Sequence, residues 1–430
     1  MKKKLIYVMA LCAMAISCKK ASMTEVRPLS SSYSDTTNVL MIEDEYPCMK
    51  LVTDNVVHLQ AKGMDETQPY GIIQCGEPLK TKHRYLPLET TEECLIGRID
   101  KLLSDDSSIF ILDSGNKSAF CFSQADGSFI CRFGTQGRGP GEYISLDDIT
   151  IDRKKKEVCL LDFTQYKLLF FSYDGRLLRE VPQFYGYGDV AYCGDNLLLC
   201  TRYSHNSNAP GINNSSIVLA KSDQTPLFRG FPFPEHYMDN YNSCLLNNFI
   251  TCRDDVYFVY ELSDTIWQIK ETGVCEAKYV LKFPGRDNMF EEKYFQQITS
   301  EDFKAKTDGQ PYFGGNVAIT DNFIRVDIIY GQRMVYCIST GHHYYGLSGH
   351  YYFAGYNNFK GSFTLNGTSF VDVLQPFDVC KKDLNRKETY TKKQYDHYWD
   401  YQLTEEERRL MQKMTPEDNP ILVIIDIEPF

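Results

Sequence analysis

Histidines gather in one short stretch of the chain, residues 341–353. His342, His343 and His350 supply three imidazoles, a ligand type that suits several transition metals. Their spacing matches no zinc motif, so an exposed loop with stacked aromatic rings is the alternative interpretation. These three histidines are the metal-ligand candidates of the chain.

Tyrosines alternate with these histidines, and Tyr344 and Tyr345 are the two that we single out. A tyrosine offers apolar area and a hydroxyl group together, at a small entropic cost on binding. The pair is therefore a candidate for a flat ligand-binding surface. Packing between neighbouring sheets is the alternative.

Carboxylates cluster further upstream, where Asp147, Asp148 and Asp152 lie at the start of an apolar, strand-like run. Oxygen ligands of this kind bind divalent cations, so a cation site is one interpretation. Aspartates also end strands and stabilise turns through the backbone, and the spacing of an EF-hand loop is absent. Asp147 and Asp148 are kept as ligand-binding candidates.

The stretch "FGTQGRGPGEYISLDDI", residues 133–149, holds four glycines and a proline. A P-loop would need a lysine after its last glycine, and a dinucleotide loop would need a following helix. Neither is present, because the residues after Pro140 alternate like a strand. The stretch is predicted to be a structural corner between two sheets, and Arg138 and Glu142 are its ligand-binding candidates.

No arrangement of residues identifies a catalytic centre. The nucleophile motif GxSxG does not occur in the sequence, and acidic residues are too frequent for one pair to stand out. A non-catalytic protein is therefore the first hypothesis, and the catalytic residues stay unknown. The alternative is a metal-dependent hydrolase or lyase, with a divalent cation as its cofactor.

The first residues have the pattern of an exported protein. Three lysines precede the apolar run Leu5–Ile16, which is twelve residues long, and a bilayer span needs about 20. Small residues then lead to Cys18, so residues 1–17 resemble a bacterial lipoprotein signal, and Cys18 is predicted to carry lipid after cleavage. Residues 18–37 are rich in serine and threonine, which is typical of a flexible tether.

Charge limits the partners of the mature chain. Cleavage at Cys18 would remove three lysines and move the formal net charge from −11 to −14. Nucleic-acid binding relies on basic surfaces, so no nucleic-acid partner is expected. The membrane is expected to be reached through the lipid alone.

Cysteines Cys121 and Cys131 flank a predicted Asp-Gly turn. With a two-residue loop Phe122 would pair with Cys131, whereas a three-residue loop would place the two cysteines opposite each other. Whether they are bonded stays open at this stage. The other cysteines in apolar runs are expected to be small, buried hydrophobic residues.

Two long stretches repeat one pattern. The stretches that begin at Arg98 and Asp148 each contain an apolar strand, a second strand ending in Asp113 or Asp162, a third strand, an Asp-Gly turn and a fourth strand. Asp-Gly between alternating apolar runs is a strong hairpin indicator. The repeat of 49 residues has the length of one blade of a β-propeller. Units are predicted to begin near residues 98, 148, 189, 245, 316 and 361.

The C-terminal region predicts one helix and one strand. Thr404 and Glu407 have the spacing of a capping box before "EEERRLMQKM". The final apolar run "PILVIIDIEPF" is predicted to be a strand. A ring of sheets must join its first and last members, so we expect this strand to pair with one near "RYLPLETTEE", residues 84–93.

These stretches carry a family resemblance. "RIDKLL", "IFILD", "FGTQGRGPGEY", "SDTIWQI" with "KYVLKF", and "NPILVII" resemble the six-bladed β-propeller lipoproteins of Bacteroidetes, of the NHL/TolB-like kind. The resemblance runs from about Glu89 to the C-terminus and does not include residues 38–80. It implies a fold and a location in the cell envelope, and little chemistry.

The expected protein is thus all-β: a six-bladed propeller of four-stranded antiparallel blades, residues 89–430, with a short C-terminal helix and an N-terminal tether. Residues 38–88 are an N-terminal segment leading into it. We expect a lipid-anchored envelope protein, at the outer membrane, that binds or scaffolds a glycan, peptide or protein. The membrane face and the oligomeric state stay open.

Overall fold

The structure is a computed structural model of the 430-residue chain. The residues that it describes are 23–26, 40–43, 46–60, 81–202, 204, 206–233, 247–259, 263–282, 313–328, 332–347, 363–380 and 404–429. Cys18, His350 and the tether beyond residues 23–26 lie outside these ranges. Residues 283–312, between the fourth and fifth predicted units, lie outside them as well.

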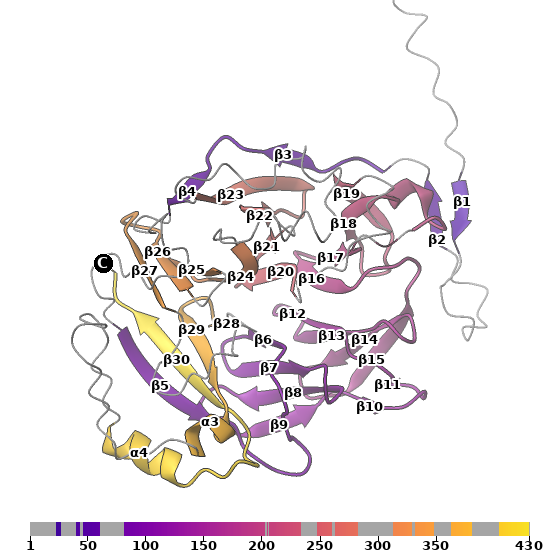
Figure 1. Cartoon of the computed structure of the whole chain (residues 1–430). Coiled ribbons are helices and arrows are strands. Elements are labelled where there is room, and N and C mark those ends of the chain that lie inside the picture. Colours follow the sequence, from indigo (N-terminus) through magenta and orange to yellow (C-terminus); the bar gives the residue numbers. More distant parts are fainter. Residues whose placement is uncertain are drawn as a thin grey trace, which may run out of the picture.

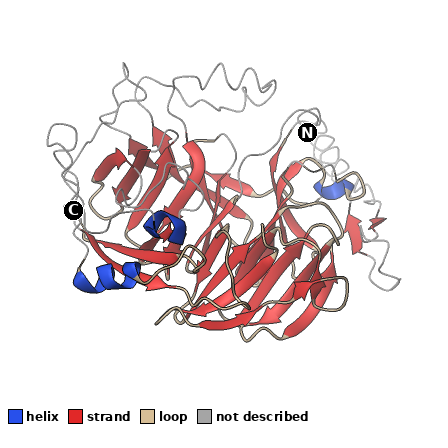
Figure 2. Cartoon of the chain, turned by 60° about the horizontal axis from the view of Figure 1, so that its bottom comes forward, coloured by secondary structure: helices blue, strands red, loops and turns tan. Residues whose placement is uncertain are grey.

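Six antiparallel sheets stand around one axis (Figure 1), which confirms the predicted six-bladed propeller. Apolar runs rich in β-branched and aromatic side chains favour these strands. The blades begin at residues 101, 148, 189, 249, 313 and 363, within four residues of the predicted starts. Figure 2 shows that strands dominate the described chain.

Blades one to three are continuous in sequence, each running from the inner to the outer strand. Their strands are, for blade one, β6 (Lys101–Ser104), β7 (Ser108–Asp113), β8 (Ser118–Ser123) and β9 (Phe129–Arg132); for blade two, β12 (Asp148–Asp152), β13 (Glu157–Asp162), β14 (Lys167–Ser172) and β15 (Leu177–Pro182); and for blade three, β16 (Asp189–Cys193), β17 (Asn196–Cys200), β18 (Ser215–Ala220) and β19 (Pro226–Pro232).

The four strands of blade four and of blade five are also consecutive, whereas blade six draws on both ends of the chain. Their strands are, for blade four, β20 (Phe249–Cys252), β21 (Asp255–Val259), β22 (Thr265–Ile269) and β23 (Val274–Lys282); for blade five, β24 (Phe313–Ile319), β25 (Phe323–Ile328), β26 (Gln332–Cys337) and β27 (His343–Leu347); and for blade six, β28 (Phe363–Leu365), β29 (Ser369–Leu374), β30 (Ile421–Ile427) and β5 (Thr81–Pro87).

The ring closes in blade six, where the last strand of the chain pairs with an early one. β30 is antiparallel to β5 along seven residue pairs, from Ile421 opposite Pro87 to Ile427 opposite Thr81. The predicted pairing of the two ends is therefore confirmed. The early strand begins at Thr81, so part of the predicted N-terminal segment belongs to the propeller itself.

Residues 46–60 of that segment form a strap along the outer edge of the ring. β3 (Lys50–Val52) and β4 (Val57–Gln60) both run parallel to β23 and extend blade four. Upstream, Met49 N donates to Arg229 O at 2.7 Å, which joins the strap to blade three. Farther upstream, β1 (Met23–Val26), which falls within the predicted tether, forms a two-stranded antiparallel sheet with β2 (Leu40–Glu43).

Apolar contact between neighbouring blades holds the ring together. Six buried clusters each combine side chains from two adjacent blades, and together they cover all six interfaces. The largest side chains that they bury are aromatic, among them Phe110, Phe170 and Phe258. Because each blade is covered on both faces, its strands are apolar on both faces, as in other doubly covered sheets.

The aspartate at the end of the second strand explains the sequence repeat. Asp113 Oδ2 accepts from Gly97 N at 2.7 Å, and Asp162 Oδ2 accepts from Ile144 N at 2.8 Å. In both blades the carboxylate satisfies the backbone of the segment that arrives from the previous blade. The repeated aspartates are thus structural residues.

The glycine-rich stretch crosses from β9, the outer strand of blade one, to β12, the inner strand of blade two, as predicted. Two short strands, β10 (Thr135–Gln136) and β11 (Glu142–Tyr143), pair in parallel within it. Gly134 and Gly141 have φ values of +65° and +75°, which L-residues rarely adopt.

Two short helices, α3 (Pro376–Cys380) and α4 (Glu405–Gln412), pack beside blade six. Thr404 caps α4, and the capping box with Glu407 is present on both sides, which confirms that prediction. Among the helices of the described ranges, none is long and apolar enough to span a membrane.

Candidate functional site

A cavity of about 230 Å³ opens at the end of the ring where the turns between first and second strands project. Blades two, three and four supply these turns, and Leu103 of blade one also reaches the cavity. We call it the turn-end cavity. Its lining residues are Leu103, Thr150, Ile151, Asp152, Arg153, Lys154, Tyr192, Cys193, Gly194, Thr251, Arg253, Asp254, Asp255, Val256, Ile269, Lys270 and Glu271.

Hydrogen bonds to an aspartate carboxylate and residues with positive φ values stabilise the conformation of these turns. Asp152 Oδ1 accepts from Lys154 N and Lys155 N, both at 2.9 Å. Gly194 and Arg253 have φ values of +60° and +51°, a conformation that allows tight turns. Each turn therefore presents its polar side chains at a fixed place on the rim.

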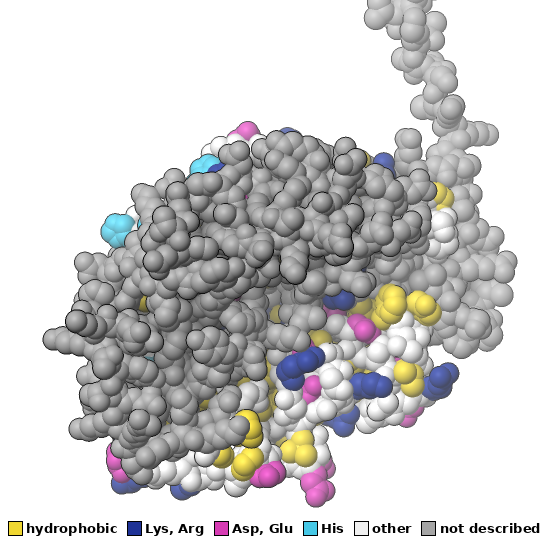
Figure 3. All heavy atoms as spheres, viewed as in Figure 1, with side chains coloured by type: hydrophobic (Ala, Val, Ile, Leu, Met, Phe, Trp, Pro, Cys, Tyr) yellow, Lys and Arg dark blue, Asp and Glu magenta, His cyan; other side chains and the backbone are white. Residues whose placement is uncertain are grey.

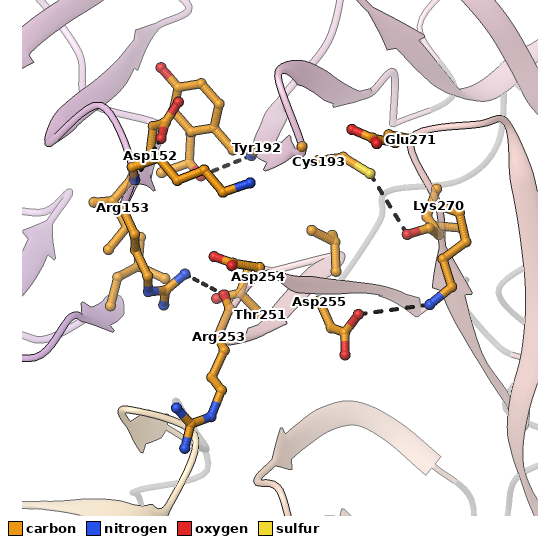
Figure 4. A pocket seen from close by; sticks show the side chains of 17 residues that line it. Asp152, Arg153, Tyr192, Cys193, Thr251, Arg253, Asp254, Asp255, Lys270 and Glu271 are labelled. Carbon is orange, nitrogen blue, oxygen red and sulfur yellow. Dashed lines mark hydrogen bonds and ion pairs between the residues drawn. The ribbon is translucent and has the colours of Figure 1, made fainter.

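Arg153 is the central polar side chain of the wall. Its Nε and Nη2 donate to Ser104 O at 3.2 and 2.9 Å, and its Nη1 donates to Arg253 O (Figure 4). The guanidinium group thus connects blade two to blades one and four. All three nitrogens of the guanidinium group donate to backbone carbonyls in this way. The role of Arg153 in the described structure is therefore to connect the turns of the rim.

Several other charges on the rim are already paired. Lys270 Nζ lies 3.8 Å from Asp255 Oδ1, and Figure 4 shows the two side chains pointing toward each other. Arg253 Nη2 lies 2.6 Å from Asp321 Oδ2 of blade five. Such exposed pairs contribute little to stability, and they leave the cavity close to charge balance.

Three charged side chains of the lining remain without a partner among the residues that the structure describes: Lys154, Asp254 and Glu271. All three are exposed. They come from blade two and from two different turns of blade four. The cavity therefore offers one unpaired cation and two unpaired carboxylates to a ligand.

The buried part of the wall is not suited to nucleophilic chemistry. Burial, with the nearby Glu271 carboxylate, raises the pKa of the Cys193 thiol to about 12, so this cysteine stays protonated near neutral pH. Burial also raises the pKa of Tyr192, whose hydroxyl donates to Glu157 Oε1 at 2.6 Å. Both groups serve as neutral parts of the wall.

Asp147 and Asp148, the two carboxylates kept as ligand-binding candidates, lie at the start of β12, away from the turns that line this cavity, whereas Asp152 of the same sequence cluster is part of the lining. Asp148 is 1% exposed and its Oδ1 lies 2.7 Å from Lys101 Nζ. Asp147 Oδ2 accepts from Phe163 N at 2.8 Å. Both carboxylates have structural partners, and their ligand-binding role stays a prediction.

Arg138 and Glu142 both lie in the crossing between β9 and β12. They form no ion pair with each other in the described structure. Glu142 Oε2 accepts from Gly139 N at 2.6 Å, which stabilises the loop. Arg138 is exposed. Neither residue lines the turn-end cavity, so a ligand at this loop also stays a prediction.

Of the histidine and tyrosine stretch, His343–Leu347 forms β27, the outer strand of blade five. His342 is exposed, His343 begins β27, and Tyr344 is 7% exposed and packs against blade six. Tyr345 pairs with Met334 in the register of the sheet. Within the described part of the chain, no three His, Cys, Asp or Glu residues are grouped as metal ligands.

Sequence reasoning missed the turn-end cavity, although a signal was present. The turns "DRKKKE", "CGDN" and "CRDD" occupy the same position in three successive blades, and all carry charge. Aligning the blades by their first strands would have placed these turns side by side. On the part of the surface that is coloured in Figure 3, basic and acidic side chains lie among one another.

Comparison with known proteins gives a family and a fold. The sequence matches the family described as domain of unknown function DUF4934 over residues 55–426. No curated protein matches the chain. A crystal structure from Bacteroides fragilis NCTC 9343, of a protein described as exported, is 18% identical with a TM-score of 0.62, covering 88% of this chain and all of the other.

Two further structures are more distant. A DUF4221 family member from Bacteroides vulgatus is 8% identical with a TM-score of 0.44, covering 82% of this chain and 98% of its own. Virginiamycin B lyase from Staphylococcus aureus is 11% identical with a TM-score of 0.40, covering 81% of this chain and all of its own. At these scores neither likeness bears on function.

Proposed function

The chain belongs to the DUF4934 family, and from its propeller fold we propose that it is an exported, non-catalytic binding protein whose ligand occupies the turn-end cavity. Lipid on Cys18 would hold it at the cell envelope, with residues 18–37 as the tether. The observation that carries the proposal is the set of unpaired charges around the cavity, Lys154, Asp254 and Glu271.

Charge favours a ligand that carries both signs. An ammonium group would bind Asp254 or Glu271, and a carboxylate would bind Lys154 through charge-assisted hydrogen bonds. Short peptides with free termini have both groups. A cavity of about 230 Å³ is below the size of pockets for drug-sized ligands, so it would receive only one or two residues of such a chain.

The lining gives less support to a sugar. Recognition of a sugar ring commonly uses an exposed aromatic face, because the ring stacks on it. Tyr192 is the single aromatic residue of the lining that the structure describes, and it is 8% exposed. We therefore favour a peptide over a glycan.

Fluorescence polarisation with labelled tripeptides that have free termini tests the site. We expect a subset to bind, with Kd raised about tenfold or more by Lys154→Glu or Glu271→Lys, a loss of about 1.4 kcal/mol per tenfold. Lys221→Glu and Glu92→Lys change exposed charges away from the cavity and serve as controls. Affinity for oligosaccharides, unaffected by the two site variants, would contradict the proposal.

The lipid anchor has its own test. Cys18→Ala should move the protein from the membrane fraction to the soluble fraction, because the acyl chains would be lost. Cys380→Ala is the matched control, since Cys380 is an exposed free cysteine of the folded body. If the Cys18→Ala protein stayed membrane-bound, another attachment would be needed.

A further inference from the structure

Two cysteines lie directly opposite each other in blade one. Cys121 of β8 pairs with Cys131 of β9 in the antiparallel register. A bulge next to this pair removes Ile130 from the ladder, and without it Ile130 would take the place of Cys131. Sequence analysis predicted that a three-residue loop would place the two cysteines opposite each other. In the structure Ser123 N donates to Ser128 O, so the turn is longer, and the bulge restores the opposed position of the cysteines.

The backbone suits a bond between the two sulfur atoms. Directly opposite residues of antiparallel strands have Cα atoms about 4.5–5.5 Å apart. Disulfides form over Cα separations of about 4.4–6.8 Å. The opposed positions of Cys121 and Cys131 in the register fall within this range, so little backbone rearrangement would be required.

The two cysteines differ in access and in acidity. Cys121 is fully buried, whereas Cys131 is partly exposed on the outer strand. Interaction with the facing Cys131 thiol, together with burial, raises the pKa of Cys121, and interaction with Cys121 lowers the pKa of Cys131. The accessible thiol is therefore the first to ionise, and the thiolate is the reactive form.

We propose that Cys121 and Cys131 form a redox-active dithiol that converts reversibly to a disulfide by exchange with an external disulfide. The Cys131 thiolate attacks one sulfur of that disulfide, forms a mixed disulfide and releases the first thiol. Cys121 then loses its proton and attacks the Cys131 sulfur, which releases the second thiol. The external disulfide gains two electrons and two protons, and the protein loses them.

Oxidation would alter the contact between blades one and two. Cys131 Sγ now donates to Tyr173 O of blade two at 3.4 Å. A disulfide has no hydrogen to donate, so this bond would disappear while β8 and β9 became covalently joined. The pair does not line the turn-end cavity, and its chemistry does not depend on the proposed ligand.

Peptide mapping of the full-length protein after treatment with oxidised glutathione tests the proposal. Trypsin cleaves after Lys117 and Arg132, so a single peptide, residues 118–132, contains both cysteines. We expect this peptide to become lighter by two hydrogen atoms and to resist alkylation after unfolding. Reduction should restore two alkylation sites.

The buried Cys159 lies alone in the tryptic peptide of residues 157–167 and is the internal control, because it should stay alkylatable throughout. Cys121→Ser should stop at a glutathione adduct on Cys131, whereas Cys131→Ser should leave Cys121 unmodified. Double alkylation of the wild-type peptide after oxidation, or a cross-link to a different cysteine, would overturn the proposal.

Discussion

Lys101 Nζ lies 2.7 Å from Asp148 Oδ1, and the two side chains are 7% and 1% exposed. The pair joins the inner strands of blades one and two. Asp148 Oδ2 also accepts from Val190 N at 2.8 Å, which extends the connection to blade three. A single carboxylate therefore links three neighbouring blades at the centre of the ring.

Replacing this carboxylate should destabilise the whole propeller. Asp148→Ala leaves the Lys101 ammonium buried without its partner, and breaking a buried pair in this way costs about 3–5 kcal/mol. We expect a loss of that size in the free energy of unfolding, measured by urea denaturation. The double variant Lys101→Met with Asp148→Asn should be less destabilised, because no charge remains unpaired. Equal losses in both would contradict this account.

Stability should fall in acid partly through Glu157. Burial acts to raise its pKa, but hydrogen bonds from Arg179 and Tyr192 outweigh burial, and the pKa lies below the usual 4.5. Because the pKa of Glu157 is lower in the folded state than in the unfolded state, its ionised form stabilises the protein at any pH above the pKa of the unfolded state. This contribution is lost as the pH falls below about 4.5 and then through the pKa of the folded state.

Urea midpoints measured from pH 6 to pH 3 check this expectation, with Glu157→Gln as the comparison. The variant should be less stable at pH 6 and should lose less stability on acidification, because the amide does not titrate. The two curves should converge at the acid end. Parallel curves would show that Glu157 does not contribute to the pH dependence.

The strap should contribute to stability through one buried side chain. Leu59 is fully buried in the cluster between blades four and five. Leu59→Ala should lower the free energy of unfolding by about 2–5 kcal/mol, as large-to-small core changes do. Leu51→Ala, at a strap residue that is 50% exposed, is the matched control and should change it by less than about 0.5 kcal/mol. Similar small effects in both would mean that the strap is not part of the core.

Asn419 should be sensitive to a change of one atom. Its Oδ1 accepts from Ile96 N at 2.8 Å, and its Nδ2 donates to Glu89 O at 2.6 Å and Cys94 O at 2.8 Å. Asn419→Asp would place a carboxylate oxygen against two carbonyls, and each unsatisfied buried group costs about 1–3 kcal/mol. Chemical denaturation should show a loss above about 2 kcal/mol. Asn322→Asp, at an exposed asparagine, should be nearly neutral.

Much of the fold was predictable because it depends on local patterns. The Asp-Gly turns and the repeated Asp113 and Asp162 positions determined blade length and number, and the final apolar strand predicted the closure. The strap was not predictable, since parallel pairing of β3 and β4 with β23 connects residues more than 200 positions apart. Its short strands show no alternation long enough to indicate a partner.

The candidate site was less predictable for a related reason. Clustered types of residue drew attention to Asp147, Asp148 and the histidines, whereas the turn-end cavity is assembled from single charges in separate blades. Only the ring brings Lys154, Asp254 and Glu271 to one rim. Such a site becomes visible once the blades are placed in order around the axis.

Blade six combines β5 (Thr81–Pro87) with β30 (Ile421–Ile427), which lie more than 330 positions apart in the chain. During synthesis, circular closure must therefore await the emergence of β30. Until then β5 has no β30 to pair with, and blades one and five flank an unfinished gap. A chain that stopped before Ile421 would therefore yield an open ring with exposed strand edges, a form prone to aggregate.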